Sequence, residues 1–435
     1  MLGMKDVLKQ IIIDFHKRQL PKLTPRNIEF PKLPSNVRKA CVYIGMRRSG
    51  KTYLMFQKIQ ELLSQGVKKQ QILYINLEDD RLDGLKLQDL QKITDAYFEL
   101  YPEFAEDQVY FFFDEIHEVD HWEKFIRRLL DTEDIQIYLS GSSSKMLSKE
   151  IATSLRGRTV VREVFPFSFP EYLKHKEVSI LQNPSSKERA LLVNQCEQFV
   201  LYGGFAETIN AGPSVHTELL QGYIDTVIYR DIIERYEVKN TTALKRLLIQ
   251  ILQNPATLFS VHKFYSHLKS LGYATSKDSL YSFVQYFEDA YCFFFVPAFN
   301  LSEYKSEQKA KKFYPVDQGL ITAFSTLDGL KDAQRLETAV FCALRRKTSS
   351  ISYYLTKGKK EVDFLTVDAK QNMALYQVSV SLKEPSTRKR ELDALKQAML
   401  ELKLEKGVII TREEEEILEC DEGMIQILPI WKFLL

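Results

Sequence analysis

One eight-residue segment, residues 45–52, constrains the fold of this chain more than any other. It reads Gly-Met-Arg-Arg-Ser-Gly-Lys-Thr and satisfies every fixed position of the pattern G-x-x-x-x-G-K-[ST]. An apolar run at residues 40–44 precedes it, and a helical pattern of apolar residues follows it as far as Gly66. A strand, a glycine loop and a helix in this order form the context in which such a loop cradles phosphates. The sequence therefore predicts a nucleotide-binding domain of the α/β class.

The residue types within the loop explain how it would hold phosphates. Gly45 and Gly50 let the backbone curl so that successive N–H groups point toward phosphate oxygens. We expect Lys51 to reach the β- and γ-phosphates and Thr52 to offer its hydroxyl to a magnesium ion. The predicted nucleotide contacts are Gly45, Arg47, Arg48, Ser49, Gly50, Lys51, Thr52 and Tyr53.

A pair of acidic residues follows a second apolar run. Residues 109–113 read Val-Tyr-Phe-Phe-Phe and end in Asp114-Glu115. A central parallel strand is buried on both faces, and its carboxyl end opens where α/β sheets bind ligands. We predict that Asp114 holds magnesium through water and that Glu115 polarises the attacking water. His117 follows closely, but magnesium prefers oxygen ligands, so we assign it no metal.

The composition excludes several other classes of protein. The 435 residues carry a formal net charge of +2, so any attraction to nucleic acid must come from local basic patches. The five cysteines include no C-x-x-C pair, which argues against a zinc site or a disulfide framework. No apolar run approaches the roughly 20 residues of a membrane span, and the first residues do not resemble a signal peptide. We expect a cytoplasmic protein without a membrane partner.

Two further residues complete the predicted nucleotide site. A strand at 135–139 ends in Ser140-Gly-Ser-Ser-Ser, and we expect Ser142, or failing it Ser143, to sense the γ-phosphate. Such a sensor is typical of P-loop ATPases with an extra strand between their two nucleotide-binding strands. Arg158 precedes a strand at 159–164, where oligomeric ATPases often place an arginine finger for the neighbouring subunit. A surface arginine in a turn is the alternative.

Changes in periodicity divide the chain into five segments. Residues 1–36 read as an amphipathic helix and a proline-rich linker, and residues 37–165 as the nucleotide-binding core. Residues 166–236 read as a helical lid, and residues 237–322 as a winged helix in which serines 260 and 276 cap two helices. Residues 323–435 read as a further α/β domain.

These motifs resemble a family of prokaryotic AAA+ ATPases in which the ATPase core precedes a helical linker and a C-terminal domain of unknown function. The resemblance is carried by residues 45–52, 111–116, 139–143, 155–158, 165–169, 229–232 and 315–320. It spans nearly the whole chain. It implies a P-loop parallel sheet of the AAA+ (ASCE) type, with ATP and Mg²⁺ as cofactors, and it leaves the biological role open.

The winged-helix segment raises the possibility of a DNA partner. Its third helix presents Lys277, and a basic segment that includes lysines 305, 309, 311 and 312 would form the wing. Such lysines hold the phosphates of double-stranded DNA. The helix offers no arginine for reading guanine, however, so we expect little sequence specificity. A winged helix used only for internal packing is the alternative.

The last segment runs helix, three strands, helix, strand, which resembles restriction-endonuclease-like PD-(D/E)XK domains. Their chemistry needs Glu, Asp and then Glu-x-Lys. Glu337 and Asp363 match, but Gln377 and Ser379 stand at the other two positions. Gln377 has no charge to hold a metal ion, and Ser379 cannot replace a lysine near the attacking water. We predict an inactive domain that still binds nucleic acid or a partner protein.

The sequence thus predicts an ATPase that couples ATP binding and hydrolysis to conformational change, acting on DNA, on a protein partner or as a homo-oligomer. Two alternatives stay open: a nucleotide-dependent switch that barely hydrolyses ATP, and an ATP-regulated nuclease. The Asp114-Glu115 pair favours hydrolysis, because a switch does not need the second carboxylate. Gln377 and Ser379 argue against the nuclease.

Overall fold

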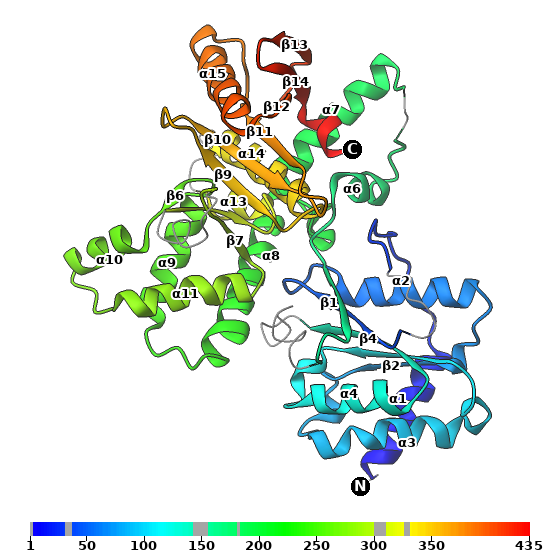
Figure 1. Ribbon diagram of the computed structural model, residues 1–435. Coiled ribbons are helices and arrows are strands. Elements are labelled where there is room, and N and C mark those ends of the chain that lie inside the picture. Colours follow the sequence, from blue (N-terminus) through cyan, green and yellow to red (C-terminus); the bar gives the residue numbers. More distant parts are fainter. Residues whose placement is uncertain (1–2, 31–36, 142–154, 181–182, 300–309, 326–330) are drawn as a thin grey trace. The chain divides into compact units, whose positions relative to one another are not determined.

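The computed structural model describes residues 3–30, 37–141, 155–180, 183–299, 310–325 and 331–435. Ser142 and Ser143 therefore lie outside the described residues. The chain divides into two compact units, residues 1–164 and 165–435, and each is built on sheets of its own (Figure 1).

The first unit contains a fully parallel sheet of five strands, and the sequence predicted the parallel arrangement. The strands are β1 (Ala40–Ile44), β2 (Ile72–Asn76), β3 (Val109–Asp114), β4 (Ile135–Gly141) and β5 (Thr159–Glu163), in the order β2-β3-β4-β1-β5. β4 is thus the extra strand that separates β1, which leads into the loop, from β3, which ends at Asp114. The carboxyl ends of these three strands lie side by side, at the edge where α/β sheets bind ligands.

Helices cover both faces of this sheet. They are α1 (Met4–Lys17), α2 (Lys51–Ser64), α3 (Gln91–Leu100) and α4 (Trp122–Thr132), with α2 and α4 on opposite faces (Figure 1). Phe112 packs in one cluster with Leu54 of α2, whereas the ring of Phe113 lies 6.0 Å from that of Phe125 in α4. Successive phenylalanines thus serve opposite faces, which explains why β3 is apolar throughout. The 3-10 helices of this unit are η1 (Lys69–Gln71), η2 (Asp80–Leu82), η3 (Leu87–Asp89), η4 (Pro102–Phe104) and η5 (Ile116–Glu118).

The second unit begins with helices. They are α6 (Phe169–His175), α7 (Ser186–Tyr202), η7 (Ala206–Thr208), α8 (Pro213–Thr226), the π-helical η8 (Val227–Glu234), α9 (Thr241–Gln253), α10 (Val261–Ser270) and α11 (Lys277–Asp289). Ser260 and Ser276 cap α10 and α11 through their side chains, as predicted. Among the described residues, no helix is both long and apolar enough to cross a membrane.

A small antiparallel sheet follows α11. Its strands are β6 (Leu258–Phe259), β8 (Lys311–Pro315) and β7 (Phe293–Val296), paired in that order. This sheet corrects one prediction, because Lys312 is only 4% exposed and cannot reach a DNA phosphate as a wing lysine would. The strand turns its side chain inward. Lys311 is half-buried, and lysines 305 and 309 lie outside the described residues.

A mixed six-stranded sheet completes the second unit. Its elements are α13 (Gly319–Phe324), α14 (Asp332–Arg345), β9 (Ile351–Leu355), β10 (Glu361–Val367), β11 (Met373–Val378), α15 (Pro385–Leu402), β12 (Lys406–Thr411), β13 (Glu416–Cys420), β14 (Gly423–Pro429) and α16 (Ile430–Leu434). The strand order is β13-β14-β12-β11-β10-β9. The predicted run of helix, three strands, helix and strand is present, and the hairpin β13–β14 and α16 extend it.

A β-bulge interrupts β10. The register against β9 shifts between Val362 and Leu365. As a result, Val362 and Leu365 pack with α15, whereas Phe364 packs with α14. The bulge therefore changes the direction of the side chains around Asp363, one of the two carboxylates predicted to match an endonuclease centre.

Candidate nucleotide-binding site

The loop of residues 45–52 joins β1 to α2, so the predicted strand, loop and helix are all present. Gly45 and Gly50 have φ angles of 149° and 98°, which favour glycine. A Cβ at Gly45 would lie 2.3 Å from the carbonyl oxygen of Val164 and cannot be accommodated. Gly50 is the N-cap of α2, so the helix N-terminus faces the loop, as phosphate binding requires.

Lys51 lies inside the loop. Its side chain is 4% exposed, and its Nζ donates hydrogen bonds to the carbonyl oxygens of Gly45 at 3.1 Å and Met46 at 3.2 Å. The same nitrogen lies 3.9 Å from Oε1 of Glu115. The loop's own carbonyls therefore satisfy the ammonium at the position from which it would reach phosphates.

Thr52 and Asp114, the two residues predicted to hold magnesium, are in direct contact. The Thr52 hydroxyl donates to Oδ2 of Asp114 at 2.7 Å. Tyr74 donates to the same oxygen at 2.8 Å, and Ser140 donates to Oδ1. Burial, and then the neighbouring charge of Glu115, raise the pKa of Asp114, and the hydroxyl donors oppose that shift.

The loop also contains a buried hydroxyl group that fits a phosphate oxygen. Ser49 Oγ is buried and has no hydrogen-bond partner among the described residues. A buried polar atom without a partner is costly, and a bound phosphate would satisfy it. This orphan hydroxyl, together with Lys51 and the Thr52–Asp114 pair, fits ATP with magnesium.

Glu115 occupies a strained position directly after β3. Its φ of 49° lies in the left-handed region, and its backbone N–H donates to Ser140 Oγ at 3.2 Å. His117 Nδ1 lies 3.3 Å from Oε2 of Glu115, and its Nε2 lies 3.5 Å from Oε1 of Glu118. His117 thus contacts the carboxylate predicted to activate water. The described residues contain no group of three or more His, Cys, Asp or Glu side chains that could hold a metal ion.

The other predicted contacts surround the loop. Arg47 forms an ion pair with Glu78 at 3.0 Å, Arg48 adopts a left-handed φ of 67°, and Tyr53 is 51% exposed in the first turn of α2. Arg158 is not part of this site. Its carbonyl oxygen accepts from Ala40 at the amino end of β1, opposite the loop, and its guanidinium pairs with Asp131.

Three residues of the site were not predicted. Tyr74 and Ser140 orient Asp114, and Arg26 donates from Nη1 to the carbonyl oxygen of Ser49 at 3.0 Å. The signal for Ser140 was its place at the end of β4, one residue beyond the Leu139 that pairs with Phe113. Arg26 lies in the proline-rich linker, where periodicity carries no information about contacts.

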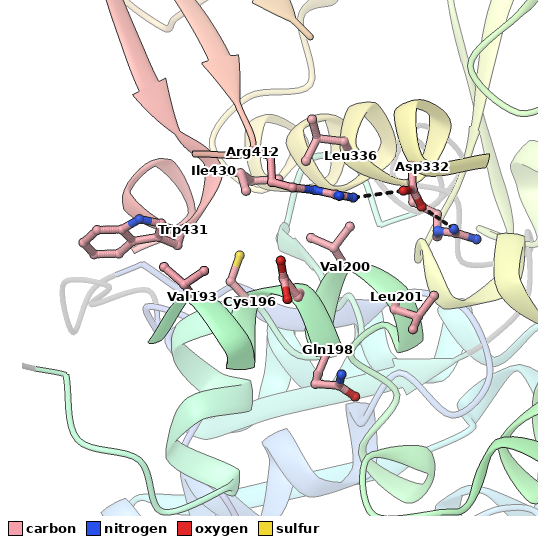
Figure 2. Close-up of a pocket in the computed structure, with 12 residues that line it drawn as sticks. Val193, Cys196, Gln198, Val200, Leu201, Asp332, Leu336, Arg412, Ile430 and Trp431 are labelled. Atoms are coloured by element: carbon pink, nitrogen blue, oxygen red, sulfur yellow. Dashed lines mark hydrogen bonds and ion pairs between the residues drawn. The ribbon is translucent and has the colours of Figure 1, made fainter. Parts of the chain in front are cut away.

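A separate cavity of about 250 Å³ lies in the second unit, between α7, α14 and α16. Figure 2 shows Arg412 pointing toward Asp332 across it, with Cys196 on the side of α7. Asp332 forms ion pairs with Arg335 at 2.5 Å and with Arg412 at 3.1 Å. These three charged side chains of the cavity lining are therefore paired with one another. Burial raises the pKa of Cys196 to about 12, which disfavours the thiolate form of its side chain. None of the lining residues belongs to the predicted nucleotide site.

Comparison with known proteins decides the family. Residues 37–173 match an AAA domain, and residues 193–331 and 334–433 match two domains of unknown function, DUF8612 and DUF4143. The uncharacterized protein MJ1544 of Methanocaldococcus jannaschii is 34% identical, over 100% of this chain and 96% of that protein. The chain belongs to this family of AAA-domain proteins. The predicted resemblance is therefore confirmed.

This AAA-domain chain also resembles more distant proteins. An uncharacterized protein of Haemophilus influenzae is 30% identical over 74% of this chain and 78% of that protein. Among solved structures, the ORC1 protein of Aeropyrum pernix in complex with DNA is 12% identical with a TM-score of 0.30, and covers 75% of this chain and 93% of that one. Cdc6p of Pyrobaculum aerophilum is 13% identical with a TM-score of 0.25, over 66% and 87%.

Proposed function

We propose that the first unit binds ATP with magnesium and hydrolyses it, as an AAA+ domain of the ASCE type. The observation that carries this proposal is that four side chains lie together at the carboxyl ends of β1 and β3. Thr52 Oγ1 lies 2.7 Å from Asp114 Oδ2, and Lys51 Nζ lies 3.9 Å from Glu115 Oε1. The AAA-domain match and the position of β4 between β1 and β3 support it.

Each side chain has a role that follows from its position. Lys51 would exchange its carbonyl partners for the β- and γ-phosphates, to which its charge is better matched. Thr52 would hold magnesium directly and Asp114 would hold it through water, and magnesium when bound neutralises phosphate charge. Glu115 would accept a hydrogen bond from water and orient it for attack. We further propose Ser142 as the γ-phosphate sensor and Arg158 as a finger for the site of a neighbouring copy.

Glu115→Gln tests this proposal. The variant should bind ATP as the wild type does and release almost no phosphate, because an amide cannot take a proton from water. Glu118→Gln is the matched control, since Glu118 also contacts His117 but lies further along η5. Phosphate release at the wild-type rate in Glu115→Gln would refute the assignment.

A nucleotide-dependent switch is the second candidate, and one observation favours it. Glu115 has both Lys51 and His117 within 4 Å, so its carboxylate has cationic or polar neighbours other than water. His117→Ala distinguishes the two. If His117 holds Glu115 away from water, the variant should turn over faster than the wild type; if the protein is a competent ATPase, turnover should be unchanged or lower.

We propose double-stranded DNA as a partner of the second unit. The order of α9, α10 and α11 followed by the β7–β8 pair supports a winged helix, and Lys277 is exposed at the start of α11. ATP hydrolysis should be measured with and without DNA over a series of protein concentrations. Stimulation that grows with concentration and is lost in Lys277→Glu would support an oligomeric ATPase on DNA. No stimulation would favour a protein partner.

A further inference from the structure

Three carboxylates of the C-terminal domain converge on one buried ammonium group. Lys312 Nζ lies 3.0 Å from Oε1 of Glu337, 2.8 Å from Oε1 of Glu361 and 2.9 Å from Oδ1 of Asp363. Glu337 belongs to α14, the other two carboxylates belong to β10, and Lys312 comes from β8 in the small sheet. The Tyr314 hydroxyl donates to the same Glu337 oxygen at 2.7 Å.

Glu337 and Asp363 are the two residues that match a metal-dependent endonuclease, and their surroundings do not fit a metal. Magnesium binds oxygen ligands at about 2.0–2.1 Å, whereas these oxygens stand at hydrogen-bond distances around a nitrogen. Oδ2 of Asp363 is also engaged, because it accepts from the Val378 N–H at 2.9 Å.

Gln377, which stands at the third carboxylate position, is directed elsewhere. Its Oε1 accepts from the Asp363 N–H at 3.2 Å, and its amide nitrogen donates to Oε2 of the buried Glu391 at 2.7 Å. A glutamate at this position would face Glu391 as a second buried negative charge, which is costly. The neutral amide therefore suits this network, and a metal-binding residue would not.

Lys312 keeps its charge in this environment. Burial lowers the pKa of a lysine, but here Tyr314 and the three carboxylates outweigh burial and raise the pKa of Lys312 above its usual value. Burial and the neighbouring charge of Asp363 raise the pKa of Glu337, whereas the Lys312 ammonium and the hydrogen bonds from Tyr314 and Lys312 oppose that shift. A buried ammonium without partners would be very unfavourable, so these carboxylates stabilise Lys312 as much as it stabilises them.

We infer that the Lys312 ammonium takes the place of a divalent cation among Glu337, Glu361 and Asp363. The centre is thus an internal cross-link that joins β8 to the mixed sheet, and it does not cleave nucleic acid. Unlike a metal ion, this cation is covalently part of the chain and does not dissociate. The inference does not depend on ATP hydrolysis by the first unit.

Thermal unfolding of the 435-residue chain with Mn²⁺ or with EDTA tests the inference. The wild type should show the same response as Asp363→Asn, because no metal binds at this centre. Lys312→Ala should unfold at a lower temperature in EDTA and regain stability as Mn²⁺ rises, because the freed carboxylates then accept the ion. The double variant Lys312→Ala/Asp363→Asn should lose that regain. Lys311→Ala is the matched control, one residue away on the same strand.

Two outcomes would overturn the inference. One is a Mn²⁺-dependent rise in the wild type that Asp363→Asn abolishes, which would mean that the centre binds metal despite Lys312. The other is a Lys312→Ala variant that folds but whose unfolding temperature does not change with Mn²⁺. If Lys312→Ala does not fold, the comparison of wild type with Asp363→Asn still decides, together with a cleavage assay on DNA with Mn²⁺. Cleavage by the wild type that disappears in Asp363→Asn would refute the inference.

Discussion

Tyr74 donates its hydroxyl hydrogen to Oδ2 of Asp114 at 2.8 Å, across two neighbouring strands of the parallel sheet. Burial raises the pKa of Tyr74, so its hydroxyl stays protonated and remains a donor. Thr52 donates to the same carboxylate oxygen and Ser140 to the other one. The carboxylate proposed to hold magnesium is therefore oriented by three hydroxyls, and only Thr52 belongs to a recognised motif.

Tyr74→Phe should lower ATP turnover without unfolding the protein. A hydrogen bond to a charged group contributes about 1.5–3 kcal/mol, so a loss of roughly 10- to 100-fold is expected if Asp114 must be held in place. The ring stays packed against Phe15 and Phe56, which preserves the core. Tyr110→Phe is the control, because its hydroxyl donates to the exposed Gln108 and, among the described residues, does not contact Asp114. Equal turnover in both variants would contradict the role of Tyr74.

Arg26→Gln should weaken ATP binding. The buried guanidinium donates to the Ser49 carbonyl, and two hydrogen bonds of 2.6 and 3.2 Å join the Arg26 backbone to Gln57 of α2. The substitution keeps the backbone bonds to Gln57 but removes the guanidinium bond to Ser49, which should loosen the phosphate loop and lower the affinity for ATP about tenfold. Titration with a fluorescent ATP analogue measures it. Arg38→Gln, whose guanidinium donates to the exposed Asp131, should bind normally; equal affinities would exclude Arg26 from this role.

Asp317 should make the stability of the second unit depend on pH. Its carboxylate accepts from the N–H groups of Gly204 and Gly319, both at 2.8 Å, and burial raises its pKa to about 6. The folded state therefore binds the proton more tightly than the unfolded state, so the free energy of unfolding falls as pH rises from about 4 to about 6. The total fall is roughly 3 kcal/mol.

The Asp317→Asn variant should not show this fall in the free energy of unfolding with rising pH. Denaturant unfolding at several pH values measures the difference in stability between wild type and variant, which should shift in favour of the variant between about pH 4 and pH 7. Exposed Asp368, tied to Asn372 within its own turn, provides the control substitution Asp368→Asn. A difference that does not change with pH would mean that Asp317 titrates normally.

Arg158→Ala should lower turnover only when copies of the chain associate. Within one chain Arg158 lies at the opposite end of the sheet from the loop and pairs with Asp131, so the proposed finger would have to act on the site of another copy. Turnover per molecule should rise with protein concentration in the wild type and stay flat in Arg158→Ala. Asp131→Asn removes the ion pair and retains the arginine, so it should behave as the wild type. An equal loss at all concentrations would refute a role between copies.

Most of the first unit could be predicted because its signals are local. A glycine loop between an apolar strand and a helix, and a buried strand that ends in two carboxylates, can be recognised within a few residues of sequence. Tyr74 and Arg26 could not be predicted, because they contact residues that are 40 and 23 positions away in the chain. Ser142 was expected as a sensor because it follows the strand at 135–139, and it lies outside the described residues; the structure places Ser140, at the end of the same strand, in contact with Asp114.

The C-terminal domain shows the same division. Its order of elements and the pairing of Glu337 with Asp363 followed from the sequence, but the expected exposed wing lysine at position 312 proved to be buried between them. The sequence by itself determined the phosphate loop, the apolar strands and the acidic pair, because each depends on neighbours in the chain. Only the tertiary structure decided which charge balances the carboxylates of the last domain, because that charge arrives on another sheet, where burial makes the pairing of charges obligatory.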